Sequence, residues 1–489
     1  MKRWLLVMGM GSFASMVGCP TSPPALCDYE ACEPPDGAVL DGGDSGFDAP
    51  ANCDLKKDPK DSLECIANSV GVFVSPTGAD TNDGTREKPV ATLGKALALV
   101  GGKPRIYVCE GTYEGSVDVG KSVGIYGGLK CDWTPTTTHP VIVGSKPSYA
   151  VQVTAVNVAL TDVDVTAKAG SVAGESSIGV FANGAQALKL ARVKVAAGAG
   201  VAGSNGSTGS NYTVIAQSDA KIIGNNGAGI AGAGPKACTN CVDGKNSTGG
   251  GGGAGGLSPG DGSGGSPSLG GGAKGIASVD GGACTPGGLG ASPLAGASAV
   301  SPSVVGALGS TGWSASDGAG GTAGSPGQGG GGGGGGYDPG NAVGGAGGGG
   351  CGGCGGAAGS GGKGGGSSIA IVSFNSTITL TACELTSGAA ADGGKGAAGQ
   401  AGQLGGFQGP PASKGCAGGD GGNGGAGGSG AGGSGGVSVG IAYKGTKPVT
   451  DAATDGKITV GTKGNKGTGG TPTVNDGIDG VAQAVLQVP

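Results

Sequence analysis

Two aspartates separated by one residue are the first feature of this chain that could do chemistry. Asp162 and Asp164 flank Val163, and alternate residues of an extended strand project from the same face. Two carboxylates on one strand face could present oxygen ligands to Ca²⁺. The simpler interpretation is a ladder of outward charges, because Arg192 and Lys194 occupy the matching places in a similar segment downstream. Cross-strand pairs of opposite charge stabilise a sheet by about 0.2 to 1 kcal/mol each.

A second set of polar residues comprises Asp80, Asn82 and Asp83. These residues could also hold Ca²⁺, but Asp and Asn side chains commonly bond to nearby backbone in turns without a metal. The single histidine, His139, lies in Thr-Thr-Thr-His-Pro and is interpreted as a loop residue. One histidine cannot build a multi-histidine metal site, and a histidine-based triad is not expected. We therefore expect no catalytic residue and no cofactor, with Ca²⁺ as the one alternative.

The cysteines indicate a chain that is exported to an oxidising compartment, where disulfides persist. The sequence contains 14 of them. Cys238 with Cys241 and Cys351 with Cys354 are C-x-x-C pairs that a zinc site could use, but low-complexity sequence separates the pairs, so disulfides are preferred. Cys383 lies in an apolar strand-like run and is interpreted as a buried free thiol. The disulfide candidates are Cys27, Cys32, Cys53, Cys65, Cys109, Cys131, Cys238, Cys241, Cys284, Cys351, Cys354 and Cys416.

The first residues have the pattern of an export signal. Lys2 and Arg3 precede an apolar stretch that is too short to span a bilayer. The stretch ends in Met16-Val17-Gly18-Cys19, which resembles the lipobox of bacterial lipoproteins, although Met16 stands where leucine is usual. The resemblance implies that residues 1–19 form a signal peptide and that Cys19 carries a lipid. Ordinary cleavage and secretion without a lipid is the alternative.

Glycine dominates the composition, with 122 of 489 residues, while only 3% of residues are aromatic and 13% are charged. An ordinary globular core cannot be built from such a chain. The net charge of −5 provides no basic surface, so nucleic acid is not expected as a partner. Many matches to G-x-G-x-x-G arise by chance in this composition, and none lies in a βαβ unit. Residues 20–70 are rich in Pro, Asp and Gly and are expected to tether the lipid to the folded part.

Residues 71–130 contain an ordered series of elements. A strand at 72–74 is followed by the turn at 80–85, a helical stretch at 95–100, a strand at 105–108 and then Gly111-Thr112-Tyr113. This order resembles the N-terminal cap and first coil of the pectate-lyase-like right-handed β-helix proteins. The resemblance implies an all-β parallel solenoid whose open apolar end is covered by the helix. That family includes polysaccharide lyases and many exported proteins without known activity.

Three downstream segments, at 149–166, 176–195 and 367–385, repeat one pattern of short alternating strands. The rung pattern resumes after long glycine repeats, so we expect these insertions to project from one side of the solenoid. The predicted division places rungs at 131–235, 367–387 and 437–489, with glycine-rich insertions at 236–366 and 388–436.

Glycine recurs at every third position in four runs, at 318–336, 344–365, 393–405 and 415–436. A period of three is that of the polyproline II type of helix. A collagen triple helix is not expected, because proline is sparse in these runs. The runs resemble polyglycine II bundles, as proposed for the glycine-rich mycobacterial surface repeats and found in one class of insect antifreeze protein. A disordered linker is the alternative, since ordering glycine costs more backbone entropy than ordering any other residue.

Together these features predict a non-catalytic structural protein that is lipid-anchored at the outer membrane or cell surface. It would display its glycine-rich arms for adhesion, for envelope organisation or for contact with extracellular polysaccharide or matrix. The alternative is a calcium-dependent polysaccharide lyase or a carbohydrate-binding β-helix module. A lyase would need acidic ligands, an unpaired basic residue and aromatic platforms on one face of the solenoid, and the rung sequences show no such cluster.

Overall fold

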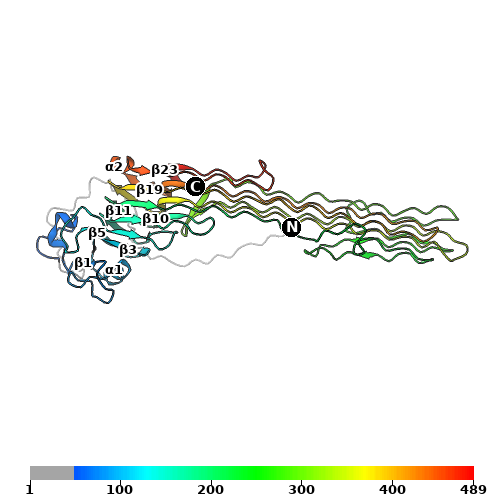
Figure 1. The fold of residues 1–489 in the computed structure, drawn as a ribbon, viewed down its shortest axis with the longest axis horizontal. Coiled ribbons are helices and arrows are strands. Elements are labelled where there is room, and N and C mark those ends of the chain that lie inside the picture. The colour runs from blue at the N-terminus through cyan, green and yellow to red at the C-terminus, as the bar shows by residue number, and fades with distance from the viewer. Residues whose placement is uncertain (1–48) are drawn as a thin grey trace, which may run out of the picture. The chain divides into compact units, whose positions relative to one another are not determined.

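The computed structural model describes residues 49–489, which form three parallel sheets and a set of extended glycine-rich segments (Figure 1). Cys19, Cys27, Cys32 and the predicted signal peptide lie outside the described residues. Sheet A orders β1 (Gly71–Val74), β2 (Arg105–Cys109), β5 (Val123–Leu129), β8 (Asn157–Thr161), β11 (Ala187–Ala191), β18 (Ile378–Thr381) and β21 (Val449–Thr450). Sheet B orders β22 (Ile458–Thr459), β19 (Glu384–Ser387), β12 (Lys194–Ala197), β9 (Asp164–Thr166), β6 (Val141–Val143) and β3 (Thr112–Glu114). Sheet C orders β23 (Ala482–Gln487), β20 (Ser438–Lys444), β17 (Ser368–Phe374), β10 (Ser177–Asn183), β7 (Val151–Val153) and β4 (Val117–Val119).

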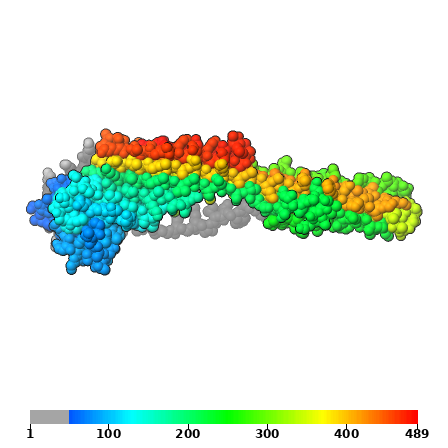
Figure 2. Space-filling view, viewed as in Figure 1, coloured from blue at the N-terminus to red at the C-terminus, as the bar shows by residue number. Residues whose placement is uncertain are grey.

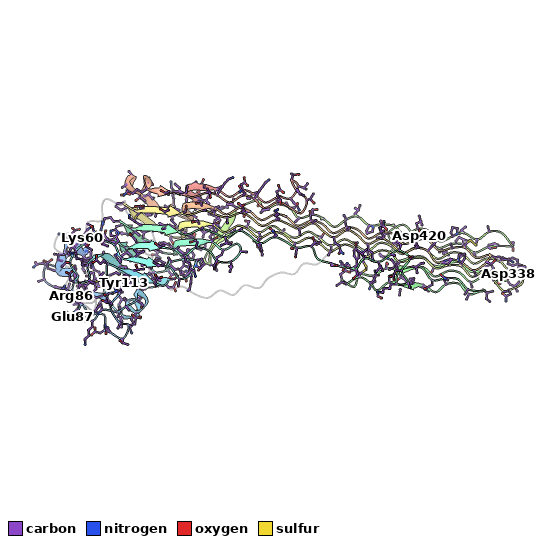
Figure 3. The ribbon with its side chains drawn as sticks, in the orientation of Figure 1. Lys60, Arg86, Glu87, Tyr113, Asp338 and Asp420 are labelled. Atoms are coloured by element: carbon purple, nitrogen blue, oxygen red, sulfur yellow. A yellow bond between two sulfur atoms is a disulfide. The ribbon has the colours of Figure 1, made fainter. Side chains whose placement is uncertain are left out.

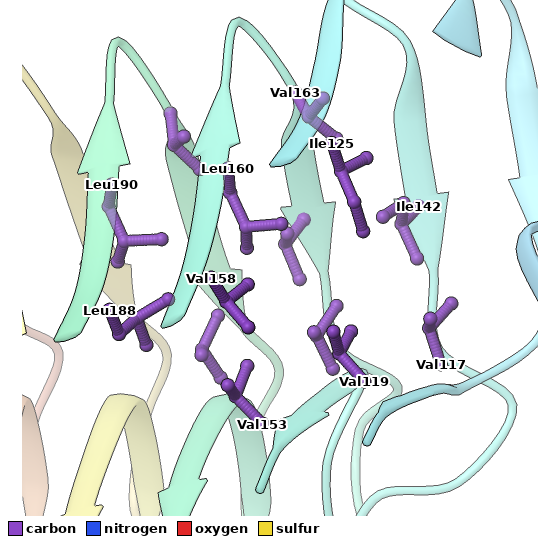
Figure 4. Close-up of a cluster of buried hydrophobic side chains, with 14 of the residues drawn as sticks. Val117, Val119, Ile125, Ile142, Val153, Val158, Leu160, Val163, Leu188 and Leu190 are labelled. Atoms are coloured by element: carbon purple, nitrogen blue, oxygen red, sulfur yellow. The ribbon is translucent and has the colours of Figure 1, made fainter. Parts of the chain in front are cut away.

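The chain visits sheets C, A and B in turn, and each rung pairs in parallel with the rung before it. Inward side chains therefore stack in columns, as in β11 and β8, where Leu188 lies over Val158 and Leu190 over Leu160 (Figure 4). All four side chains are buried, and this interior column is the core of the domain. The predicted parallel β-helix is confirmed.

One short helix closes the N-terminal end of the solenoid. Helix α1 (Leu93–Leu99) begins after Thr92, whose hydroxyl accepts a hydrogen bond of 3.1 Å from the Lys95 N–H and so caps the helix. Leu93, Ala96 and Leu97 face the core and are buried. The predicted covering helix is therefore present, shifted by two residues at its start from the expected stretch.

The segment before β1 folds onto the solenoid instead of acting as a tether over its whole predicted length. It contains two 3₁₀ turns, η1 (Pro59–Asp61) and η2 (Leu63–Cys65). The Arg105 guanidinium donates to the carbonyls of Leu55 and Lys57 at 2.9 and 2.7 Å, which fixes this segment against sheet A. Residues 53–66 thus differ from the expected tether, because they have buried partners on the first strands.

Every glycine-rich insertion leaves after a strand of sheet B and returns at a strand of sheet C. The insertions connect β12 to β17, β19 to β20 and β22 to β23. Ser177 still pairs in register with Ser368 across the longest of them. All three insertions therefore leave and re-enter the solenoid between sheets B and C. The strands before the first insertion end at Ala197, well before the expected boundary at 235.

Two small hairpins lie within the first insertion. One pairs β13 (Lys236–Ala237) with β14 (Thr248–Gly249), and the other pairs β15 (Gly306–Gly309) with β16 (Gly312–Ala315). Trp313 of the second hairpin packs on the outer face of sheet C and donates to Ser367 Oγ at 2.9 Å. A single turn of helix, α2 (Ala452–Asp455), follows β21 near the end of the solenoid.

The inserted segments bond to one another through their backbones. We call the segments 199–233, 249–299, 316–366, 388–436 and 460–480 the glycine array. In its central hairpin, every third N–H from Gly318 to Gly336 donates to every third carbonyl from Gly362 back to Gly344, at 2.8 to 2.9 Å. Asp338 lies in the turn of that hairpin, at the end of the array that is remote from the strands (Figure 3).

Each glycine-rich segment has neighbours on several sides. Three successive N–H groups, of Gly349, Gly350 and Cys351, donate to three different segments, at Gly250, Gly419 and Ile222. Three residues per turn is the geometry that directs successive groups to three sides. A Cβ added to Gly349 would lie 1.9 Å from the carbonyl oxygen of Gly330, so the array requires glycine there.

Candidate functional site

The corner between sheets A and B carries the polar cluster of the solenoid. Asp162, Arg192 and Ala382 occupy this corner in three successive rungs, each with a positive φ of 51° to 54°. The residue that follows each of them points into the core. The sequence interpretation, which put Asp162 and Asp164 on one strand face, was wrong. Asp162 lies in the corner before β9, whereas Asp164 is the first residue of β9.

Arg192 forms the centre of the cluster. Its Nε and Nη2 donate to the two carboxylate oxygens of Asp162 at 2.6 and 2.8 Å, and Nη2 also donates to Asp58 at 2.6 Å. The Lys60 ammonium lies 3.4 Å from Asp162 Oδ2. The predicted pairing of Asp162 with Arg192 is confirmed, and two residues of the folded N-terminal segment extend it.

Asp164 makes a different set of contacts from the one predicted. Its Oδ1 accepts the Lys194 backbone N–H at 3.0 Å, while the Lys194 ammonium lies 3.5 Å from Glu384 in the next rung. His139 Nδ1 lies 2.9 Å from the same Asp164 oxygen, and its Nε2 lies 3.6 Å from Asp162. The expected loop histidine is thus a partner of both aspartates.

The electrostatics of the cluster favour ion pairing. Burial alone would raise the pKa of Asp162, but hydrogen bonds from Arg192, with the nearby Lys60 charge, hold that pKa below its ordinary value. The hydrogen bonds that Arg192 donates to Asp162 and Asp58 raise the pKa of its guanidinium. Asp162 and Arg192 thus form the central ion pair, with Asp58 and Lys60 as further partners. Within residues 49–489, no group of three or more His, Cys, Asp or Glu side chains is placed to hold a metal ion.

The polar turn at residues 80–85 uses its side chains to fix its own backbone. Asp80 accepts from the N–H groups of Ala91 and Thr92 and from the Thr92 hydroxyl, at 2.8 to 3.0 Å. The Asn82 amide donates to the Pro89 carbonyl at 2.8 Å. Asp83 likewise accepts from the N–H and the hydroxyl of a threonine two residues on. Burial opposes ionisation of Asp80, but the bonds from Thr92 lower its pKa overall. These contacts are the turn chemistry expected from the sequence.

The disulfides connect segments that are distant in sequence. Cys238 is bonded to Cys351 and Cys241 to Cys354, each across a separation of 113 residues. In an extended helix with three residues per turn, cysteines three positions apart are separated by about 9 Å along the axis, which is too far for them to bond to each other. Both thiols share one edge and face a neighbouring helix, which explains the two parallel bridges and leaves no thiol for zinc. The other bridges join Cys53 to Cys65, Cys109 to Cys131 and Cys284 to Cys416.

Cys383 is a buried free thiol, as predicted. It follows Ala382 at the corner described above, in the column that Val163 and Val193 occupy in the two preceding rungs. A thiol substitutes for a small apolar side chain in that column. Burial raises the pKa of the Cys383 thiol, so it is a poor nucleophile.

Polar side chains complete the hydrogen bonding along the glycine array. Asn423 Oδ1 accepts the Gly405 N–H at 3.0 Å, and Asp420 Oδ1 accepts the Gln408 N–H at 2.7 Å. Gln403 Oε1 accepts the Cys354 N–H at 3.1 Å. Side-chain oxygens thus take up backbone donors of adjacent segments. The mixed residues between the glycines therefore have a structural use.

Comparison with known proteins gives one match. A family model described as "Protein of unknown function (DUF1565)" matches residues 76–122, and that family is associated with parallel β-helix proteins. The matched residues include helix α1 and strands β2, β3 and β4 of the solenoid. No curated protein and no solved structure matches the chain. Within residues 49–489, no helix has the length and apolar character needed to span a membrane.

Sequence reasoning missed part of the polar cluster. Register alone placed Arg192 over Asp162, because stacked rungs align equivalent residues. Asp58 and Lys60 lie in a segment interpreted as a tether, and nothing in their spacing relates them to a corner more than two rungs along the solenoid. His139 was predicted to lie in a loop, but its contacts with Asp162 and Asp164 were not predicted, because its loop has no counterpart in the other rungs.

Proposed function

We propose that this protein is a non-catalytic display scaffold, anchored by a lipid on Cys19 at the outer membrane or cell surface. The observation that carries the proposal is the continuity between solenoid and array. Gly200 donates to Ala389 at 3.0 Å and Gly393 donates to Asn465 at 2.9 Å, so segments leaving successive rungs remain stacked beyond the strands. An arm built in this way holds its surface at a fixed distance from the solenoid.

The packing of the array supports a mechanical function. Its helices combine backbone bonds with neighbours on several sides, bare glycine edges and disulfide bridges. These are the features by which the runs resemble polyglycine II bundles. Figure 2 shows that the C-terminal residues, drawn in red, cover only the part of the array nearest the solenoid. The remaining length of the array is left accessible on this face. An accessible and ordered arm suits adhesion or contact with extracellular matrix.

The catalytic alternative is a calcium-dependent polysaccharide lyase, which the resemblance of residues 71–130 to pectate-lyase-like proteins suggests. The paired charges around Asp162 argue against it, because a lyase needs a free basic residue to abstract a proton from the sugar. The assay is the release of unsaturated products from polygalacturonate with added Ca²⁺. Cleavage that disappears in the Asp164→Asn variant would replace the scaffold proposal with the lyase.

Display is tested with an epitope inserted between Gly340 and Asn341, which are exposed in the turn at the remote end of the array. The proposal predicts that an antibody labels intact cells and that the Cys19→Ala variant releases the epitope into the medium or the soluble fraction. Labelling only after cell lysis would contradict surface display.

A further inference from the structure

We propose that a pocket between the glycine array and the segment that begins at β13 binds the oxyanion group of an acidic sugar. Lys221 and Lys236 line this pocket together with Thr213, Ile215, Thr239 and Asn240. No carboxylate lines it. The pocket lies next to the two parallel disulfides, and its ligand would be the carboxylate or sulfate of an extracellular polysaccharide unit.

Five lysines of the glycine array have a carboxylate partner, whereas the two pocket lysines have none within residues 49–489, a feature that they share with Lys395. The ammonium groups of Lys274, Lys363, Lys414, Lys463 and Lys466 each lie 2.7 to 3.0 Å from a carboxylate oxygen. Among the described residues, Lys221 and Lys236 have no carboxylate within 4.0 Å. The nearest acid in sequence, Asp219, accepts the Lys221 backbone N–H at 2.8 Å. Two cations that share a pocket repel each other, and a bound anion removes that cost.

The groups around the pocket are held in place. The Lys236 ammonium donates to the Ala220 carbonyl at 2.6 Å, which brings the two lysine-bearing segments together. Cys238 and Cys241 flank Thr239 and Asn240 and tie them to the core of the array through their disulfides. An ammonium that is fixed before binding, as that of Lys236 is, loses less conformational entropy when the ligand arrives.

An amide pair beside the lysines is incompletely hydrogen-bonded, at atoms that are buried beneath the pocket surface. The Asn240 amide donates to Gln403 Oε1 at 2.8 Å. This leaves Asn240 Oδ1 and Gln403 Nε2 as buried polar atoms without a partner in the described residues. Such atoms are uncommon in folded proteins and are normally satisfied by water or a bound group.

The size of the pocket selects the ligand class. Its volume of about 440 Å³ lies within the roughly 300 to 1,000 Å³ of small-molecule sites and is far larger than one inorganic ion requires. The lining combines two cations with threonine hydroxyls, one amide and the apolar Ile215. A sugar ring that carries an anion presents the complementary hydroxyls, charge and apolar face.

The test uses the soluble mature chain, without its lipid, and titrates it calorimetrically with a trigalacturonate and with a sulfated oligosaccharide at low salt. A neutral oligosaccharide of similar length is the probe for binding without charge. We expect the paired variant Lys221→Gln with Lys236→Gln to bind the anionic probe at least tenfold more weakly. Thermal unfolding of each variant shows whether the array remains folded.

The matched control is Lys245→Gln with Lys395→Gln, which removes the same charge at two lysines of the glycine-rich insertions that do not line the pocket. Binding that is lost in the pocket variant and retained in the control supports the proposal, and the probe that binds identifies carboxylate or sulfate. Equal loss in both variants, or no preference for charged over neutral sugar, would overturn it. Neither result depends on the lipid anchor or on surface display.

Discussion

The β-helix rungs and the glycine array satisfy the same backbone requirement by opposite means. In the rungs, strands bond to two neighbours and the side chains between the sheets fill a core of Val, Leu and Ile. In the array, each helix bonds to several neighbours, and the interior positions are mostly glycines whose added Cβ would meet backbone. The rungs are therefore stabilised chiefly by apolar burial, whereas the array depends on hydrogen bonds and close backbone packing.

The register of the strands in the rungs continues into the glycine array. Thr386 of β19 pairs with Ala196 and Thr459 in sheet B. The residues that follow β12, β19 and β22 remain hydrogen-bonded to one another after the strands end. The rungs thus supply the alignment that short glycine helices cannot nucleate by themselves. The following predictions break or sharpen this contrast.

The largest effect is expected from a side chain placed in the interior of the array. A Cβ at Gly353 would lie 1.9 Å from the carbonyl oxygen of Gln403. We expect Gly353→Val to destabilise the array by more than about 4 kcal/mol, because backbone cannot move away on all sides. Urea unfolding followed by circular dichroism measures the loss.

The control for that substitution is Gly234→Val, since a Cβ at Gly234 has no atom within 4 Å. Its effect should stay within about 0.5 kcal/mol. Equal tolerance of both substitutions would show that the array is not close-packed.

The two parallel disulfides should act as one constraint. Each closes a loop with a sequence separation of 113. Replacing all four cysteines by alanine should cost about 4 kcal/mol. Removing only the bridge between Cys238 and Cys351 should cost much less, because the bridge three residues away closes nearly the same loop. Thermal unfolding of the two variants measures the difference, and additive losses would contradict the shared-loop interpretation.

An intermediate effect is expected at the corner of the rungs. Arg192→Ala leaves the buried Asp162 carboxylate without its main partner, at a cost of about 2 kcal/mol at pH 7. The pKa of Asp162 is lowered in the folded state, so this stabilisation is present above the ordinary pKa of about 4 and is lost as the pH falls below it. The difference between wild type and variant should therefore shrink in acid, and a constant difference at all pH values would exclude this origin.

The smallest effect is expected in the core of the rungs. Cys383→Val places the same residue type as the two preceding rungs in that column, and we expect a change within about 1 kcal/mol. The native thiol should also resist alkylation until the protein unfolds. Rapid alkylation of the native protein, or a loss of more than about 2 kcal/mol in the variant, would show that the column is not a simple apolar stack.

The sequence allowed the fold to be predicted further than the site. Alternating Val, Leu and Ile with repeated rung patterns predicted the β-helix, and the capping helix was expected at residues 95–100, two residues after its observed start. The period of three predicted helices of the array, but no local pattern specified which segments would become neighbours, since glycine carries no side chain to encode a partner. For the same reason the cysteines could be identified as disulfide candidates, but which cysteine bonds to which could not be predicted. The pocket of Lys221 and Lys236 depends on those connections and could not be foreseen.

Hydrogen exchange of the intact, disulfide-bonded protein tests the central claim most directly. Peptides covering residues 344–366 contain glycines whose N–H groups donate to three different segments of the array. We predict that these amides are protected to the same order as those of β17 in the rungs, because both are interior and bonded. Exchange within seconds at 344–366, with β17 remaining protected, would contradict an ordered array and leave the solenoid carrying unstructured glycine arms.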